Sequence, residues 1–242
     1  MDVLAATDFF IAEVWTQGGL VTYYVLFFMH LATRRVHIAG ITPHPNEQWM
    51  TQVARNVTMA DVGFLSSSRY LIHDRDSKFC ESFRDTIEGV GVTPIRLPAR
   101  SPKLNSFAER WVRSVKEECL SKLIFFGENS LRHALKEYVA HHHHERNHQG
   151  KDNLLLFPEP AIAQTNGLEG AIQCRERLGG LLRFYHREAA WLSFPPTFSS
   201  TSFFAVSKQA SPARSRSRFA HADPARSKRG AVDGYPRAVH PR

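Results

Sequence analysis

Three acidic residues stand where a folded chain could bring their carboxylates together. Asp8 lies inside an apolar run, between Ala6 and Phe10, where a charge is costly unless it is paired or coordinated. Asp74 directly follows a second apolar run, and Glu109 lies near the start of a helix-like segment. Three hard oxygen donors around open positions suit magnesium or manganese, and two such ions can promote an in-line phosphoryl displacement. The three residues are therefore candidate metal ligands.

Two basic residues accompany the third acid. Arg113 and Lys116 follow Glu109 by four and seven positions, so a helix would present all three on one face. Cations beside a metal site could hold the phosphates of a substrate, although two solvated charges on an amphipathic helix would give the same pattern. The other side of this helix is expected to carry Trp111, Val112, Val115 and Cys119.

The segments that must position these residues alternate between strand-like and helix-like patterns, which is typical of an α/β domain. Strands are expected at 3–15, 20–31, 34–42, 70–74 and 92–98, with a hairpin turn at 17–19. Helices are expected at 46–57, 77–91, 101–124 and 130–146. If the first and fourth strands are neighbours in one sheet, Asp8 and Asp74 converge near its edge, and the third helix can deliver Glu109 beside them.

The positive charge of the chain is concentrated at its C-terminal end. From residue 194 on, the sequence is rich in Ser, Pro, Ala and Arg and lacks periodicity, which predicts a disordered basic tail. The tail holds nine Lys or Arg against two Asp, a net of +7 out of the formal +8, which leaves about +1 for residues 1–193. Any DNA affinity of the folded part must therefore come from local patches. Both a solvated tail and a nucleic-acid-binding arm fit residues 194–242.

Several classes of protein are disfavoured by composition. The longest apolar stretch, 21–29, is too short to span a bilayer, and the first residues lack the pattern of a signal peptide. The three cysteines are far apart, which argues against a disulfide framework and a zinc knuckle. We therefore expect a cytoplasmic protein with no membrane partner.

Three stretches carry a resemblance to a known family. Asp8, HDRDSKF at 73–79 and SPKLNSFAERWVRSVKEE at 101–118 resemble the catalytic core of the DDE transposases and retroviral-type integrases, which includes bacterial insertion-sequence transposases. In that family the Glu follows S-P-x-x-N, with a basic residue seven positions beyond; here that residue is Lys116, and 34 residues separate Asp74 from Glu109. HERNHQG at 144–150 resembles the stretch that closes the core. The resemblance covers about residues 3–160.

The resemblance implies an RNase H-like α/β fold. Its mixed five-stranded sheet would have the first three strands antiparallel and helices on its flanks. The integrase catalytic core would span 1–160, followed by an extension of the core at 161–193 and the disordered basic tail at 194–242.

The resemblance also implies a function, which is DNA integration or transposition by metal-dependent phosphodiester cleavage and strand transfer at element ends. The catalytic residues, holding two Mg²⁺ or Mn²⁺ ions, would be Asp8, Asp74 and Glu109. The DNA contacts would come from Arg113, Lys116, Asn105 and Lys103. The expected partners are double-stranded DNA of the ends and the target, further copies of the chain as a homo-oligomer on DNA, and a separately encoded DNA-binding protein. The expected location is the bacterial cytosol, in association with the nucleoid.

Alternatives remain at this point. Asp76 could replace Asp74, although Asp74 takes the aspartate position of the family. An RNase H-like nuclease that cuts without joining would need a fourth acid, from Glu13 or Asp76. An inactive transposase remnant could bind nucleic acid without turnover. His144 and His148 have the spacing of a zinc pair, but the resemblance places His148 in the closing segment.

Overall fold

A computed structural model describes residues 3–98, 105–158 and 171–187 of the chain. The chain divides into two units, Met1–Ser193 and Phe194–Arg242, and every described residue belongs to the first. The predicted tail at 194–242 and the N-terminal part of the predicted third helix, 101–104, lie outside the described residues. None of the described helices is both long and apolar enough to cross a bilayer.

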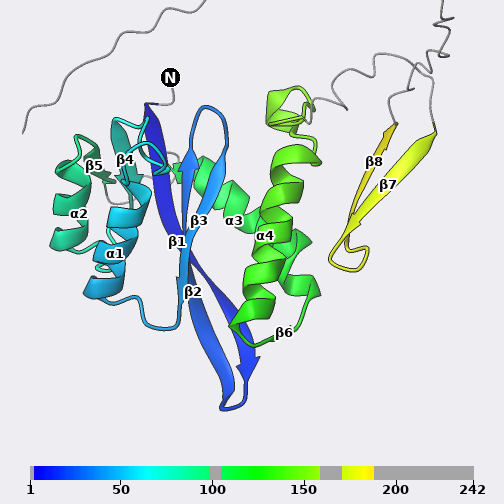
Figure 1. Cartoon of the computed structure of the whole chain (residues 1–242), viewed down its shortest axis with the longest axis horizontal. Coiled ribbons are helices and arrows are strands. Elements are labelled where there is room, and N and C mark those ends of the chain that lie inside the picture. Colours follow the sequence, from blue (N-terminus) through cyan, green and yellow to red (C-terminus); the bar gives the residue numbers. More distant parts are fainter. Residues whose placement is uncertain (1–2, 99–104, 159–170, 188–242) are drawn as a thin grey trace, which may run out of the picture. The chain divides into compact units, whose positions relative to one another are not determined.

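A mixed sheet forms the centre of the fold (Figure 1). Its strands run in the order β3-β2-β1-β4-β5. They are β1 (Leu4–Thr16), β2 (Gly19–His30), β3 (Val36–Thr42), β4 (Tyr70–His73) and β5 (Thr93–Arg96). The first three are antiparallel, whereas β4 runs parallel to β1 and β5 parallel to β4. The predicted mixed sheet is confirmed, and β6 (Phe125–Phe126) adds a short sixth strand beside the far end of β1.

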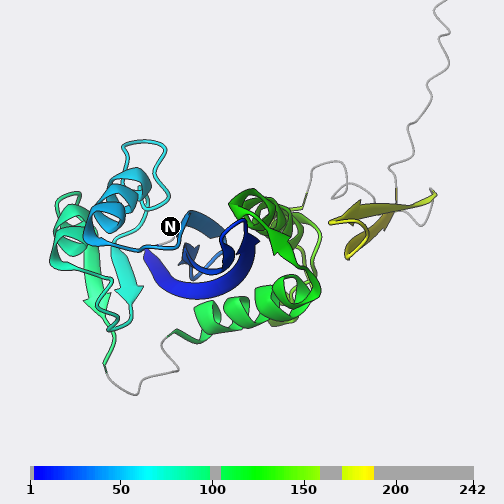
Figure 2. The same cartoon turned by 90° about the horizontal axis from the view of Figure 1, so that it is seen from below.

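Helices cover both faces of the sheet (Figure 2). α1 (Glu47–Val57) and α2 (Glu81–Glu88) pack on one face, and α3 (Ser106–Glu118) and α4 (Glu128–His144) pack on the other. β2 is buried from both sides, since Leu26 and Phe28 face the first pair of helices while Phe27 faces the second. This topology and these layers are those of the RNase H-like fold predicted from the sequence, and the prediction is confirmed.

The start of α2 and the end of α3 lie several residues from the predicted boundaries. α2 begins only at Glu81, because residues 77–80 form the turn that follows β4, and Cys80 is its extended N-cap. α3 ends at Glu118, and a 3₁₀ turn, Leu120–Lys122, follows it. The buried Cys119 lies between the two, so the apolar periodicity continues past the end of the α-helix.

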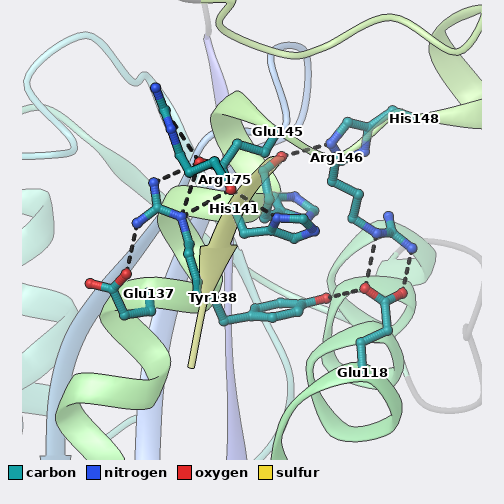
Figure 3. Close-up of polar contacts among 10 residues, drawn as sticks. Glu118, Glu137, Tyr138, His141, Glu145, Arg146, His148 and Arg175 are labelled. Carbon is teal, nitrogen blue, oxygen red and sulfur yellow. Dashed lines mark hydrogen bonds and ion pairs between the residues drawn. The ribbon is translucent and has the colours of Figure 1, made fainter. Parts of the chain in front are cut away.

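Two strands that were not predicted from the sequence, β7 (Ile172–Arg177) and β8 (Leu182–Arg187), form a hairpin. Glu145, the residue after α4, binds this hairpin to the helix (Figure 3). The Glu145 side chain is fully buried and accepts hydrogen bonds from Arg177 at 2.7–3.0 Å and from His141 Nδ1 at 3.0 Å. Arg175 adds an ion pair at 3.4 Å. A buried carboxylate surrounded by donors of this kind ties the hairpin to the core.

Glu145 should make the fold sensitive to acid. Burial opposes its charge, but the hydrogen bonds from Arg177 and His141 outweigh burial and lower the pKa of Glu145 from 4.5 to about 2. Because the pKa is lower in the folded state, the stabilisation is complete above the unfolded value of 4.5 and is lost as the pH falls toward 2. We expect Glu145→Gln to lower the free energy of unfolding at neutral pH by on the order of 2 kcal/mol, measured by denaturant titration.

The control is Glu137→Gln, which removes a partly exposed partner of Arg177. It should leave most of the acid dependence in place. Wild-type and Glu145→Gln curves of stability against pH that run parallel below pH 4.5 would contradict this account of Glu145.

Candidate active site

Parallel pairing of β1 and β4 brings the two aspartates together. The pairs Leu4–Tyr70 and Ala6–Ile72 fix the register, and continuing it by two residues sets Asp74 opposite Asp8. Asp8 lies within β1, while Asp74 is the first residue after β4. The apolar run before Asp74 is therefore the buried part of a strand, and the charge follows where that strand ends.

Trp111 holds α3 against the sheet. Its ring packs on Phe27 of β2 at a centroid distance of 4.4 Å and on Phe10 of β1 at 5.6 Å. Trp111 is 2% exposed, so this contact fixes the rotation of the helix. Glu109 lies on the exposed side of α3, toward β1.

The Asp8 carboxylate has a raised pKa. Burial, which is the largest cause, and the negative charges of Asp74, Glu109 and Asp76 together raise it to about 6, although a hydrogen bond from the Phe9 N–H lowers it. The carboxylates from β1, the β4 end and α3 therefore interact through space. A carboxylate with a raised pKa among other acids is a sign of a functional site.

Two hydrogen bonds hold the Asp8 carboxylate in place. Oδ1 accepts from the Phe9 backbone N–H at 2.7 Å, and Oδ2 accepts from Asn105 Nδ2 at 3.2 Å. Asn105 is 5% exposed, and its own Oδ1 is buried without a hydrogen-bond partner among the described residues. In this structure Asn105 thus orients Asp8, a contact that the sequence analysis did not foresee; the S-P-x-x-N motif is the signal that marks it.

Asp74 and Asp76 have different surroundings. Within the described part of the chain, Asp74 Oδ1 accepts a hydrogen bond from the Asp76 backbone N–H alone, at 3.0 Å. Asp76 accepts the backbone N–H of Lys78 at 2.9 Å and its ammonium at 2.8 Å. Burial opposes the charge of Asp76, yet these bonds to Lys78 lower its pKa. Asp74 therefore keeps more free oxygen lone pairs than Asp76 does.

A cavity of about 340 Å³ joins Asp8 to the charged face of α3. It is lined by Asp8, Phe9, Glu109, Val112, Arg113, Lys116 and Glu117. Arg113 and Lys116 are exposed on the same face as Glu109. Val112, assigned to the apolar side from the sequence, also reaches this cavity. Carboxylate and basic side chains thus line the same cavity. This combination suits a phosphate that binds the basic residues directly and the carboxylates through a metal cation.

The chemical type of the donor atoms at this site fits a divalent metal. Asp8, Asp74 and Glu109 supply the hard oxygens that Mg²⁺ or Mn²⁺ prefers, and a cation among them would relieve the repulsion that raises the pKa of Asp8. Within residues 3–98, 105–158 and 171–187, no group of three or more Asp, Glu, His or Cys side chains is already close enough to hold a metal ion. The charge of Glu109 nevertheless acts on Asp8.

The remaining candidates lie as follows. Lys103 is outside the described residues. Glu13 is exposed on β1 and is not among the charges that act on Asp8, whereas Asp76 is. His144 Nδ1 donates to the Phe157 carbonyl at 2.7 Å and His148 Nε2 donates to the His142 carbonyl at 2.8 Å, so these two rings serve the closing segment of the core. Of the possible fourth acids, only Asp76 is near the site.

Comparisons with known proteins gave one family-model match to part of the chain and several similar solved structures. A family model for the integrase core domain matches residues 90–154, the part of the chain that includes α3 and α4. The comparison with curated protein sequences gave no match.

Among solved structures, the catalytic core domain of BIV integrase aligns with 13% identity over 62% of this chain and 89% of that one, at a TM-score of 0.44. The catalytic core domain of HTLV-2 integrase in complex with magnesium, in a trimeric form, aligns with 9% identity over 64% of this chain and 93% of that one, at a TM-score of 0.47.

Replacing Asp8 by Asn should stabilise the metal-free protein. Because the pKa of Asp8 is higher in the folded state, about 6 against 3.8, ionising Asp8 costs stability as the pH rises through that range. The amide of the variant can still accept the Phe9 N–H, and Asn105, with its own amide flipped, can accept from the new NH₂ group through its unpaired Oδ1. We expect Asp8→Asn to raise the free energy of unfolding at neutral pH by on the order of 1 kcal/mol, measured by denaturant titration in chelator.

The gain should vanish below pH 3.8, where Asp8 is protonated in both states. Glu13→Gln removes an exposed acid from the same strand and should have little effect. An Asp8→Asn variant that is less stable than wild type at neutral pH would contradict the raised pKa of Asp8 in the folded state.

Proposed function

Since residues 90–154 match the integrase core domain, we propose that the protein is a metal-dependent polynucleotidyl transferase that integrates or transposes DNA. Asp8, Asp74 and Glu109 are its catalytic carboxylates. The observation that carries the proposal is a partly buried Asp8 carboxylate near further acids of the β4 end and α3, since burial first, and then the charges of Asp74, Glu109 and Asp76, raise the pKa of Asp8 to about 6. Structural salt bridges pair acids with cations, whereas a site that gathers acids beside acids suits a bound cation.

Asp8, Asp74 and Glu109 would hold two Mg²⁺ or Mn²⁺ ions. When bound, the ions supply activation of the attacking oxygen and stabilisation of the leaving oxygen of a phosphodiester. Asn105 keeps the Asp8 carboxylate oriented toward the cavity. Burial around Asp8 excludes water from one side of the site and strengthens every electrostatic interaction within it.

Arg113 and Lys116 would grip the DNA backbone across the same cavity. Lys103 precedes this helix and is proposed as a further DNA contact. The substrates are double-stranded DNA ends of a mobile element and a target duplex. Water first nicks the element end, and the freed 3′ hydroxyl then attacks the target, with copies of the chain assembled on the DNA. A separately encoded protein would supply recognition of the ends.

A nuclease that cuts without joining is the second candidate, and Asp76 favours it. Asp76 is the fourth acid that such an enzyme needs, and its charge reaches Asp8. Both of its carboxylate oxygens, however, accept hydrogen bonds from Lys78. An assay that scores joined as well as nicked products separates the two functions.

Asp74→Asn should abolish both metal binding and DNA nicking while the fold is retained. The change removes one of the metal-holding carboxylates but keeps the acceptor for the Asp76 N–H. Calorimetric titration with Mn²⁺ should show loss of binding, and cleavage of candidate end duplexes should fall by about a hundred-fold or more. Asp8→Asn and Glu109→Gln should behave alike.

Asp76→Asn is the matched control, because it alters the acid two positions along whose oxygens are held by Lys78. It should keep metal binding and most of the nicking activity. Full nicking by Asp74→Asn, together with loss in Asp76→Asn, would transfer the ligand role to Asp76. A folded wild type that binds no Mn²⁺ even with DNA present would overturn the catalytic proposal.

A further inference from the structure

A second cavity lies on the opposite side of α3 from the carboxylates. Its volume is about 650 Å³. Its walls come from the β2–β3 turn, from α3 and from the segment after α4. The Lys151 ammonium donates to the Ala32 carbonyl at 2.8 Å, which joins the turn to that segment. The proposed function leaves this cavity, which contains much of the closing motif 144–150, without a role.

The cavity concentrates positive charge. Arg34, Arg110, Arg146 and Lys151 line it, and no Asp or Glu does. Glu118 neutralises Arg146 through two hydrogen bonds at 2.5 and 3.0 Å, which Figure 3 shows. Within the described part of the chain, neither Arg34, Arg110 nor Lys151 is paired with a carboxylate. Arg34, Arg110 and Lys151 therefore line one cavity without a carboxylate partner among the described residues.

The position of Arg34 is energetically costly, because its charge is partly buried, lies near Arg110 and sits on a backbone with positive φ. Its guanidinium stacks on the Phe107 ring, 3.2 Å from the centroid, and Arg110 approaches the same ring at 5.5 Å. Burial lowers the pKa of Arg34, and the charge of Arg110 lowers it further. The Arg34 backbone also has φ of 65°, a conformation that costs energy for a side chain of this size. An anion between the two arginines would relieve their repulsion.

Two buried side chains that line the same cavity have hydrogen-bonding atoms without a partner among the described residues. Trp111 is 2% exposed and its Nε1–H has no partner among the described residues. His142 is 5% exposed and neither ring nitrogen has a partner in that same part of the chain. Burial, followed by the charge of His148, lowers the pKa of His142 to about 2, so the ring is neutral and has one N–H to donate. Buried donors without partners are rare unless a ligand or water completes them.

We propose that this cavity is a phosphate-binding site that holds the backbone of a DNA segment, with Arg34, Arg110 and Lys151 as its cations and Trp111 Nε1–H as its buried donor. Guanidinium groups recognise phosphate oxygens through paired hydrogen bonds, and their charge compensates that of the phosphodiester. The site is separate from the carboxylate cavity, because the two use opposite sides of α3. Its occupancy requires neither divalent metal nor catalysis.

The indole N–H of Trp111 gives a local readout of occupancy. Overall DNA affinity alone would not discriminate, because the chain carries a net +8 and other segments can bind DNA. The chain has four Trp, and the Trp111 signal of the ¹⁵N-labelled full chain is assigned by its loss in Trp111→Phe. With chelator present, titration with a short DNA duplex should shift this signal. Inorganic phosphate, titrated in parallel, should shift it in the same direction.

Arg34→Asn combined with Arg110→Gln should remove the shift and reduce the slope of log affinity against log salt by about 2. Asn is chosen at position 34 because it tolerates positive φ. Arg55→Gln with Arg69→Gln, which removes two exposed arginines that line neither cavity, is the matched control and should leave the Trp111 shift unchanged. Asp8→Asn with Asp74→Asn should also keep the shift, so failure of the catalytic proposal leaves this result intact.

A shift with inorganic phosphate but not with duplex DNA would overturn the DNA proposal and assign the cavity to a free phosphate compound. No shift with either ligand, or a shift that survives the Arg34→Asn and Arg110→Gln changes, would overturn the site itself.

Discussion

The repulsion among carboxylates around Asp8 is the constraint on which the rest of the site depends. A carboxylate inside a long strand costs free energy, and bringing two further acids toward it from β4 and α3 increases that cost. Packing contacts away from these charges compensate for this free-energy cost. Trp111 between Phe10 and Phe27 fixes α3, and the doubly covered β2 fixes β1. The acids are held by a core that does not itself require them, which leaves them free to bind a ligand.

Parallel pairing of β1 with β4 explains why the second aspartate must follow its strand rather than lie inside it. β1 is long enough to pair with β2 along its whole length, but β4 pairs with it only through three residues. Asp74 therefore lies where the backbone leaves the sheet, and its side chain is only half-buried. Asp8 lies inside β1, where it pairs with Phe27 of β2, and burial is the main cause of its raised pKa. The two aspartates therefore differ in how the sheet holds them, one within a strand and the other just past the end of one.

Local sequence patterns predicted the strands and the helices, because each depends on periodicity along the chain. The adjacency of β1 and β4 entered only as a condition, and their parallel pairing is shown by the structure. Local patterns did not predict the contact between Asn105 and Asp8, which joins residues far apart in sequence and depends on how α3 enters the core. β6 has only two residues, too few for a pattern, and it pairs with Val14 and Trp15 at the far end of β1, just before α4 begins. The β7–β8 hairpin was missed for a related reason: β7 ends in alternating arginine and glutamate with few apolar residues, and the anchor of the hairpin, Glu145, lies just after α4.

The charge distribution around α3 connects the two cavities. Residues 1–193 have a net charge of only about +1, so the folded part has no general attraction for DNA. Its cations are nevertheless gathered on both sides of this helix, with Arg113 and Lys116 facing acids and Arg34 and Arg110 facing none. On the first side an anion can bind only when a metal ion offsets the carboxylates, whereas on the second side an anion is favoured without one. A DNA backbone could therefore be held behind α3 before a metal ion is bound, and binding there would not require the carboxylates to be neutralised.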